Sequence, residues 1–190
     1  MIMLKKICVF CGSQPGSDAV YRQAATAMGR LMAEQGIALV FGAGMTGIMG
    51  VLADAVLAGK GEAIGVIPDS MNVPKVVHEA ITQTIVTPDM HTRKAKMVAM
   101  SDGFMALPGG YGTLDELFEV LTLSQLGYAP KPIGILNVAD YYTPLVAFID
   151  HAIEAGFVRP QHRDVFIVED DPARLLARMQ AFSAPRQATK

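Results

Sequence analysis

Short apolar runs alternate with longer amphipathic stretches along the chain, and their lengths match those of strands and helices. The runs are apolar at every position rather than at alternate positions, which is typical of strands buried on both faces of a parallel sheet. The stretches between the runs are long enough to form helices that cover such a sheet. The pattern therefore predicts one α/β domain of the doubly wound type, with a mainly parallel sheet of about seven strands and helices on both faces.

The element boundaries follow from the same pattern together with capping residues. The strands are predicted at 7–11, 37–41, 63–67, 81–86, 104–107, 133–138 and 165–168. The helices are predicted at 17–35, 47–58, 90–101, 113–126 and 143–155, with a last one starting at Pro172 behind Asp171 as its N-cap. These elements predict a single domain over 1–182, followed by a disordered tail at 183–190.

Ligands of doubly wound folds bind beyond the carboxyl ends of the strands, so the turns there are the first candidates for a site. Gly12 and Ser13 follow the first predicted strand. The second strand is followed by a turn over 42–47 that contains Gly44 and matches G-x-G-x-x-G, the dinucleotide-binding fingerprint. This fingerprint expects an acidic residue about 20 positions on, but the candidate, Asp69, stands 27 positions after Gly42 and beyond Pro68. Close packing of helix on sheet is therefore the favoured explanation of the glycines.

A third glycine turn is the sharpest signal. Gly109, Gly110 and Gly112 stand at the start of a predicted helix, where free backbone N–H groups and the helix dipole favour a phosphate. No P-loop lysine accompanies them, which argues against an ATPase of that class. Thr113 and Glu116 also fit a capping box, in which the glutamate caps the helix and has no catalytic role. Spacing alone leaves both interpretations of Glu116 open.

The helix after this turn and the basic cluster before it add further candidates. Asp115, Glu119 and Thr122 share one helical face, while apolar residues cover so wide an arc that this helix is expected to be deeply buried or to meet a second copy of the chain. Arg93 and Lys94 fall in the first turns of another helix, where positive charge is unfavourable unless an anion lies nearby. A solvated basic face is the alternative.

Composition excludes several classes of function. Hydrophobic residues make up 51% of the chain and charged residues 18%, and the net charge is −2, which argues against a nucleic-acid partner. No apolar run is long enough for a membrane span. Two cysteines without a disulfide framework fit a reducing cytoplasm. They stand on opposite faces of one strand and the histidines are scattered, so no metal site is predicted.

The two motifs together resemble the paired signature of the LONELY GUY family of cytokinin riboside 5′-monophosphate phosphoribohydrolases, proteins once labelled lysine decarboxylases. The first motif is Met90-His91-x-Arg93-Lys94 and the second is the segment from Pro108 to Glu116. The resemblance extends over nearly the whole chain. It implies a Rossmann-like fold, a homodimer and hydrolysis of the N-glycosidic bond of a nucleoside 5′-monophosphate, with no metal or organic cofactor.

The resemblance also implies residue roles. Arg93 and Glu116 match the family's catalytic pair. The candidate substrate-binding residues are Gly12, Ser13, Gly44, Met90, Arg93, Lys94, Gly109, Gly110, Tyr111, Gly112, Thr113, Leu114, Asp115, Glu116 and Thr122. Lys75 stands where the family has a substrate-binding glutamate, with Glu79 nearby as a substitute. This departure puts the preference for base or sugar in doubt, but not the type of reaction.

The proposed chemistry suits these residues. Cleavage of the ribose–base bond develops oxocarbenium character, which a carboxylate stabilises while it takes a proton from water. Glu116 is the expected general base, and the helix dipole is expected to lower its pKa. Arg93 is expected to position the substrate and to stabilise developing negative charge. The alternative is a nucleotide-binding or carrier module that does not hydrolyse its ligand, for which Lys75 is the best argument in the sequence.

Overall fold

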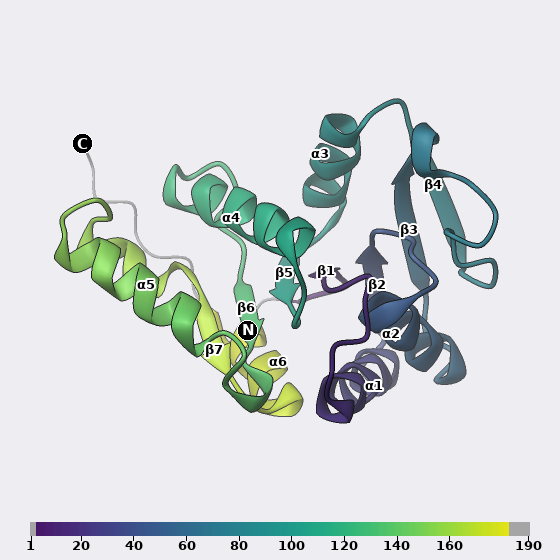
Figure 1. Cartoon of the computed structure of the whole chain (residues 1–190), viewed down its shortest axis with the longest axis horizontal. Coiled ribbons are helices and arrows are strands. Elements are labelled where there is room, and N and C mark those ends of the chain that lie inside the picture. Colours follow the sequence, from purple (N-terminus) through teal and green to yellow (C-terminus); the bar gives the residue numbers. More distant parts are fainter. Residues whose placement is uncertain (1–2, 183–190) are drawn as a thin grey trace.

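Seven strands form one sheet in the order β4-β3-β2-β1-β5-β6-β7, and every neighbouring pair is parallel (Figure 1). The structure is a computed structural model that describes residues 3–182, so the tail predicted at 183–190 lies outside it. The predicted fold class is confirmed. The strands are β1 Lys6–Phe10, β2 Ala38–Phe41, β3 Ala63–Pro68, β4 Gln83–Thr87, β5 Gly103–Ala106, β6 Ile133–Leu136 and β7 Ile167–Glu169.

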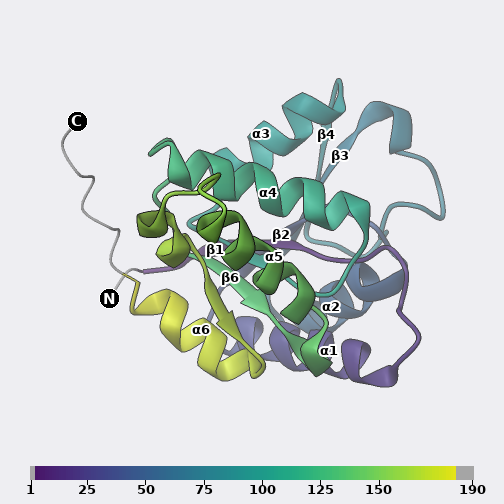
Figure 2. The same cartoon turned by 60° about the vertical axis from the view of Figure 1, so that its left-hand side comes forward.

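Helices cover both faces of this sheet, in two layers that Figures 1 and 2 show from two sides. On one face α1, α2 and α6 pack together, and on the other face lie α3, α4 and α5. The α-helices are α1 Ala19–Glu34, α2 Gly47–Ala58, α3 Met90–Met100, α4 Tyr111–Gln125, α5 Thr143–Glu154 and α6 Pro172–Gln180. The fold is therefore a three-layer α/β sandwich.

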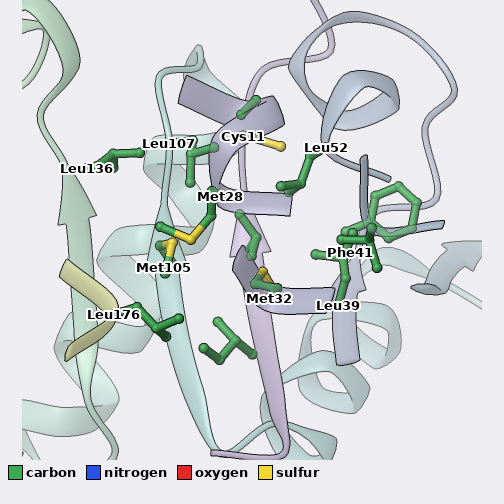
Figure 3. Packing of buried hydrophobic residues seen from close by; sticks show 14 of the residues in the cluster. Cys11, Met28, Met32, Leu39, Phe41, Leu52, Met105, Leu107, Leu136 and Leu176 are labelled. Atoms are coloured by element: carbon green, nitrogen blue, oxygen red, sulfur yellow. The ribbon is translucent and has the colours of Figure 1, made fainter. Parts of the chain in front are cut away.

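The strands are buried on both faces because each separates two apolar layers. Cys8 belongs to the core beneath α3, α4 and α5, whereas Cys11, just after the same strand, belongs to the core beneath α1, α2 and α6. This confirms that the two thiols face opposite sides of the sheet. Figure 3 shows the second core, in which Met28 and Met32 of α1 lie over the strands beside Leu107.

Aspartates begin several helices, as predicted for Asp171, whose carboxylate accepts from the Arg174 amide at 2.8 Å. The start of α4 differs from the prediction. It begins at Tyr111 with Gly110 as its N-cap, and no side chain caps it. The predicted capping box is therefore wrong, because Thr113 lies inside the helix instead of at its N-cap.

The order of the strands reverses between β1 and β5. Strands β2, β3 and β4 follow one another on one side of β1, and β5, β6 and β7 follow one another on its other side. The two strands are neighbours, and the amide of Gly12 donates to the carbonyl of Pro108 at 3.0 Å across their carboxyl ends. Such a point of reversal opens a crevice where doubly wound proteins bind ligands. Within the described residues no helix has both the length and the apolar character needed to cross a membrane.

Candidate active site at the carboxyl edge of the sheet

The second glycine turn packs against the first instead of presenting a free helix end. The carbonyl of Gly12 accepts from the amides of Ile48 at 3.0 Å and Met49 at 3.2 Å, both in the first turn of α2. A Cβ on Gly47 would lie 2.3 Å from the carbonyl carbon of Ser13. The first-turn amides that a pyrophosphate would need are therefore already bonded, and the geometry supports close packing over dinucleotide binding.

Arg93 comes from the second turn of α3, which begins behind the N-cap Asp89. Its Nε donates to the carbonyl of Val66 at 3.2 Å, and its Nη1 donates to the carboxylate of Glu116. A Cβ on Gly42 would lie 2.3 Å from Nη2 of Arg93. The glycine at the end of β2 therefore leaves the space that the guanidinium occupies.

Glu116 stands in the second turn of α4, and its carboxylate is turned toward Arg93 of α3. The Arg93 and Glu116 side chains are only 11% and 12% exposed. Burial raises the pKa of Glu116, and the attraction and hydrogen bond of Arg93 offset this only in part. The expectation that the helix dipole lowers this pKa is therefore wrong, because desolvation dominates at this depth. In a capping box the Glu116 carboxylate would accept from the backbone N–H of the N-cap residue, but in the structure it accepts from Arg93.

Lys94 connects the two helices on the outer side of this pair. Its ammonium lies 3.1 Å from Asp115 and 3.1 Å from Glu119, both on α4. Burial by itself would lower the pKa of Lys94, but the hydrogen bonds that its ammonium donates to these two carboxylates raise this pKa above its usual value. The basic cluster is therefore engaged with the acidic face of α4 and is not a free solvated surface.

The third glycine turn opens toward solvent where the second is closed. A Cβ on Gly109 would meet Thr113 Oγ1 at 2.1 Å, so this position has room only for glycine. A Cβ on Gly110 or on Gly112 would meet nothing within 4 Å. The turn therefore combines a tightly packed base with open space over its last two glycines. Tyr111 between them is 94% exposed.

Thr122 does not lie at this turn. It follows Glu116 by six residues, or about 9 Å along the helix axis, and its hydroxyl donates to the carbonyl of Phe118 at 2.8 Å. It lines a shallow groove of about 440 Å³ on the outer face of α4, a volume within the usual range for small-molecule sites. The groove is lined by Leu114, Asp115, Phe118, Glu119, Thr122 and Leu123.

The loop between β3 and β4 carries Lys75, at the position of the family's substrate-binding glutamate, and Glu79, its possible substitute. Lys75 and Glu79 are both exposed, and Lys75 has a φ of 67°. The loop is held to α2 by His78, whose Nε2 lies 2.9 Å from Asp54 Oδ1. Glu79 forms no ion pair with the described residues, so nothing in its contacts marks it as the substitute for the family's glutamate.

The other candidates lie where the sequence predicted. Gly12, Ser13 and Gly44 follow β1 and β2 at the carboxyl edge, and Met90, 41% exposed, begins α3 beside them. Among residues 3–182, no group of three or more His, Cys, Asp or Glu side chains is placed to hold a metal ion.

Sequence reasoning missed two features of this edge. The first is the space that Gly42 leaves for Arg93. The second is Tyr141, whose hydroxyl donates to the carbonyl of Gly109 at 2.6 Å. Neither has a local signal, because the partners lie 51 and 32 positions apart in the chain.

Comparison with known proteins agrees with this geometry. Residues 49–179 match the family model described as "Possible lysine decarboxylase". Over 179 residues the chain is 43% identical to a protein of Oryza sativa subsp. japonica named probable cytokinin riboside 5′-monophosphate phosphoribohydrolase, covering 94% of this chain and 73% of that one. One cytokinin riboside 5′-monophosphate phosphoribohydrolase of Arabidopsis thaliana is also 43% identical, over 94% of this chain and 84% of its own.

Solved structures share the fold at lower identity. The molybdenum cofactor carrier protein of Chlamydomonas reinhardtii has a TM-score of 0.70 at 21% identity, with 94% of this chain and 98% of that one covered. The fold and site together define a Rossmann-like α/β protein with a glycine-rich turn and a buried Arg–Glu pair at its switch point. The chain belongs to the LONELY GUY family, whose named members are cytokinin riboside 5′-monophosphate phosphoribohydrolases.

Proposed function

We propose that this protein hydrolyses the N-glycosidic bond of a nucleoside 5′-monophosphate, either a cytokinin riboside 5′-monophosphate or AMP, to the free base and ribose 5-phosphate. The observation that carries the proposal is the buried Arg93–Glu116 pair beside an open glycine turn. The names of relatives that are 43% identical point to the same reaction.

The residues suit a reaction through an oxocarbenium-like transition state. Water attacks C1′ of the ribose while the bond from C1′ to the base nitrogen breaks, and the departing base takes up a proton from solvent, to which Glu116 afterwards returns the proton that it takes from the attacking water. Glu116 takes the proton from the attacking water, and its burial favours this role because a raised pKa makes a carboxylate a stronger base. Arg93 orients that carboxylate through its hydrogen bond and keeps it from being a lone buried charge.

The phosphate is assigned to the glycine turn. The open space over Gly110 and Gly112 lies at the N-terminus of α4, where backbone N–H groups and the helix dipole attract an anion. Ser13 and Gly44 border the same edge. Thr113, Leu114 and Asp115 complete the first turns of α4. We assign the base to the groove that ends at Thr122.

Chromatography of the products from a panel of nucleoside monophosphates tests the proposal. Release of free base with stoichiometric ribose 5-phosphate is expected. The Glu116→Gln variant should lose about 10²- to 10⁴-fold in kcat, the usual contribution of a general base, while it still binds substrate. Tight binding of unaltered nucleotide by the wild type would instead support the carrier alternative.

The description of the family as a possible lysine decarboxylase suggests a second activity, which would use pyridoxal phosphate on a lysine. A Schiff-base lysine has to lose its proton easily. Lys94 is held as an ammonium by Asp115 and Glu119, and its pKa is raised. This lysine therefore does not fit the cofactor, and no step of the proposed reaction involves it.

We also propose that two copies of the chain associate through the outer face of α4, so that the groove assigned to the base lies at the boundary between the two copies. Phe118 is 39% exposed there beside Leu114 and Leu123, and such an apolar strip on a helix is typical of an interface. A mass of one chain in light scattering at micromolar concentration would refute the dimer.

We further propose the cytoplasm as the location of the protein. Both cysteines are free and buried, which suits a reducing compartment.

A further inference from the structure

The backbone turn at Val138–Asp140, next to the third glycine turn, adopts an unusual conformation. Ala139 has a φ of 49° and Asp140 a φ of 58°, a left-handed pair in residues that carry a Cβ. Residues with a Cβ disfavour this conformation, which persists only where the surroundings impose it and is often found beside functional sites.

The turn places two consecutive tyrosines against the backbone of the glycine turn. Tyr141 donates its hydroxyl to the carbonyl of Gly109 at 2.6 Å, and Tyr142 donates its hydroxyl to the carbonyl of Leu107 at 2.7 Å. Asn137 holds the second tyrosine by accepting from the Tyr142 amide at 2.6 Å. Tyr142 is fully buried, whereas Tyr141 is 41% exposed, so the two hydroxyls have different surroundings.

Three consecutive carbonyls of the glycine turn are thereby fixed. Leu107 accepts from Tyr142, Pro108 accepts from the Gly12 amide at 3.0 Å, and Gly109 accepts from Tyr141. In a trans peptide the C=O of one residue and the N–H of the next point in opposite directions. The bond to the Gly109 carbonyl therefore decides which way the N–H of Gly110 points.

This peptide is the one that most needs an external bond. It lies between two glycines, so no side chain resists its rotation. The amide of Gly110, the N-cap of α4, donates to no described backbone or side-chain acceptor, and Gly110 is exposed. With the carbonyl held by Tyr141, that amide points away from the tyrosine hydroxyl.

We infer that Tyr141 is a positioning residue of the substrate site: it holds the Gly109–Gly110 peptide so that the Gly110 amide binds the phosphate of the substrate. This inference rests on the proposed function, because it takes the glycine turn to be the phosphate site. The strained turn at Val138–Asp140 places the Tyr141 hydroxyl for that role. Tyr142 supports the base of the same turn from inside the core.

The variant Tyr141→Phe tests this with one atom removed. The ring keeps its edge contacts with Tyr21 and Tyr142, at 5.7 and 5.0 Å between centroids, so packing is unchanged. A single hydrogen bond contributes about 0.5–1.5 kcal/mol. The KM for the nucleoside monophosphate should therefore rise by about two- to tenfold with kcat nearly constant, and the inhibition constant of ribose 5-phosphate should rise by the same factor.

Tyr21→Phe is the matched control. It removes a hydroxyl from the neighbouring ring, and among the described residues that hydroxyl has no hydrogen-bond partner. Its KM and inhibition constant should equal those of the wild type. A purely structural role of Tyr141 would instead lower the melting temperature and the active fraction, and so kcat, at unchanged KM, and that result would overturn the inference.

A direct binding measurement separates this inference from the proposed reaction. Calorimetry with ribose 5-phosphate needs no turnover. If the wild type binds it but hydrolyses no nucleotide, the proposed reaction fails, and weaker binding by Tyr141→Phe still supports the positioning role. Equal binding by wild type and Tyr141→Phe would refute the positioning role even in an active enzyme. If the wild type does not bind ribose 5-phosphate at all, the phosphate site and the role of Tyr141 are both refuted.

Discussion

Gly42 provides a test of Arg93 that removes no polar side chain from the site. Gly42→Ala adds one methyl group, whose carbon would lie 2.3 Å from Nη2 of Arg93. The backbone tolerates the change, since Gly42 does not have a positive φ. The guanidinium has to move by about 1 Å to reach an ordinary contact, and a misplacement of that size can cost about 10²-fold in rate.

The fold itself should be little affected by this change. The clashing atom is the end of a flexible side chain, and the next contact, Met49 Sδ at 3.4 Å, is ordinary. An alanine also restricts the unfolded chain, which stabilises the folded state by about 0.4–1 kcal/mol. We therefore expect kcat/KM to fall by about 10²-fold, with a change of less than about 1 kcal/mol in the free energy of unfolding by urea.

A double-mutant cycle shows whether the loss passes through the guanidinium. Arg93→Ala removes the group that the new methyl would displace, so adding Gly42→Ala to it should have almost no further effect. The assays are kcat/KM and the dissociation constant of ribose 5-phosphate, which stays measurable when turnover is lost. Full activity of Gly42→Ala, or equal losses in both backgrounds, would show that Gly42 does not act by making room for Arg93.

Three further predictions concern the pH response, the glycine turn and the association of two copies. Burial raises the pKa of Glu116 above its ordinary 4.5, so kcat should fall as the pH is lowered through this raised value. The folded state holds that proton more tightly than the unfolded chain, so the stability that Glu116 contributes is complete below about pH 4.5 and is lost as the pH rises through the raised pKa. In urea unfolding from pH 4 to 7, the free energy of unfolding of Glu116→Gln should therefore increase relative to that of the wild type. Gly112→Ala should stabilise α4 by up to about 1 kcal/mol in thermal unfolding. It should also raise KM, because its methyl group would meet no protein atom within 4 Å and would fill the space assigned to the phosphate. An unchanged KM would show that the phosphate binds elsewhere. Phe118→Asp should yield monomers in analytical ultracentrifugation, and a variant that sediments like the wild-type dimer would show that α4 is not the interface.

The sheet and its covering helices could be predicted from the sequence because they depend on local pattern. Strand-length apolar runs bounded by glycine, proline and acidic residues predict the seven strands within a few residues, and α2 begins and ends as predicted. The start of α4 differs from the prediction by two residues, which changes the role of Thr113. Thr113 has the side chain of an N-cap, but the helix extends back to Tyr111 because Thr113 packs under Gly109, where it is buried.

The residue types of the candidate site were also present in the sequence, since glycines before a helix and an Arg-Lys pair after a strand have meaning at short range. Their pairing was decided only by the tertiary structure. Glu116 could have capped its own helix, and its partner turned out to be Arg93 from α3, the helix that precedes β5 in the chain. The direction of its pKa shift followed from burial, which no spacing in the chain reveals.

The sequence by itself thus determined the class of fold, the edge of the sheet where a ligand would bind, and the kinds of side chain available there, because these depend on hydrophobic period and turn chemistry. Only the tertiary structure decided that Gly42 makes room for Arg93 and that Tyr141 holds the Gly109 carbonyl. The physical reason is that contacts between residues far apart in the chain arise from the packing of whole elements, and a hydrogen bond or a missing methyl group at such a contact leaves no local pattern.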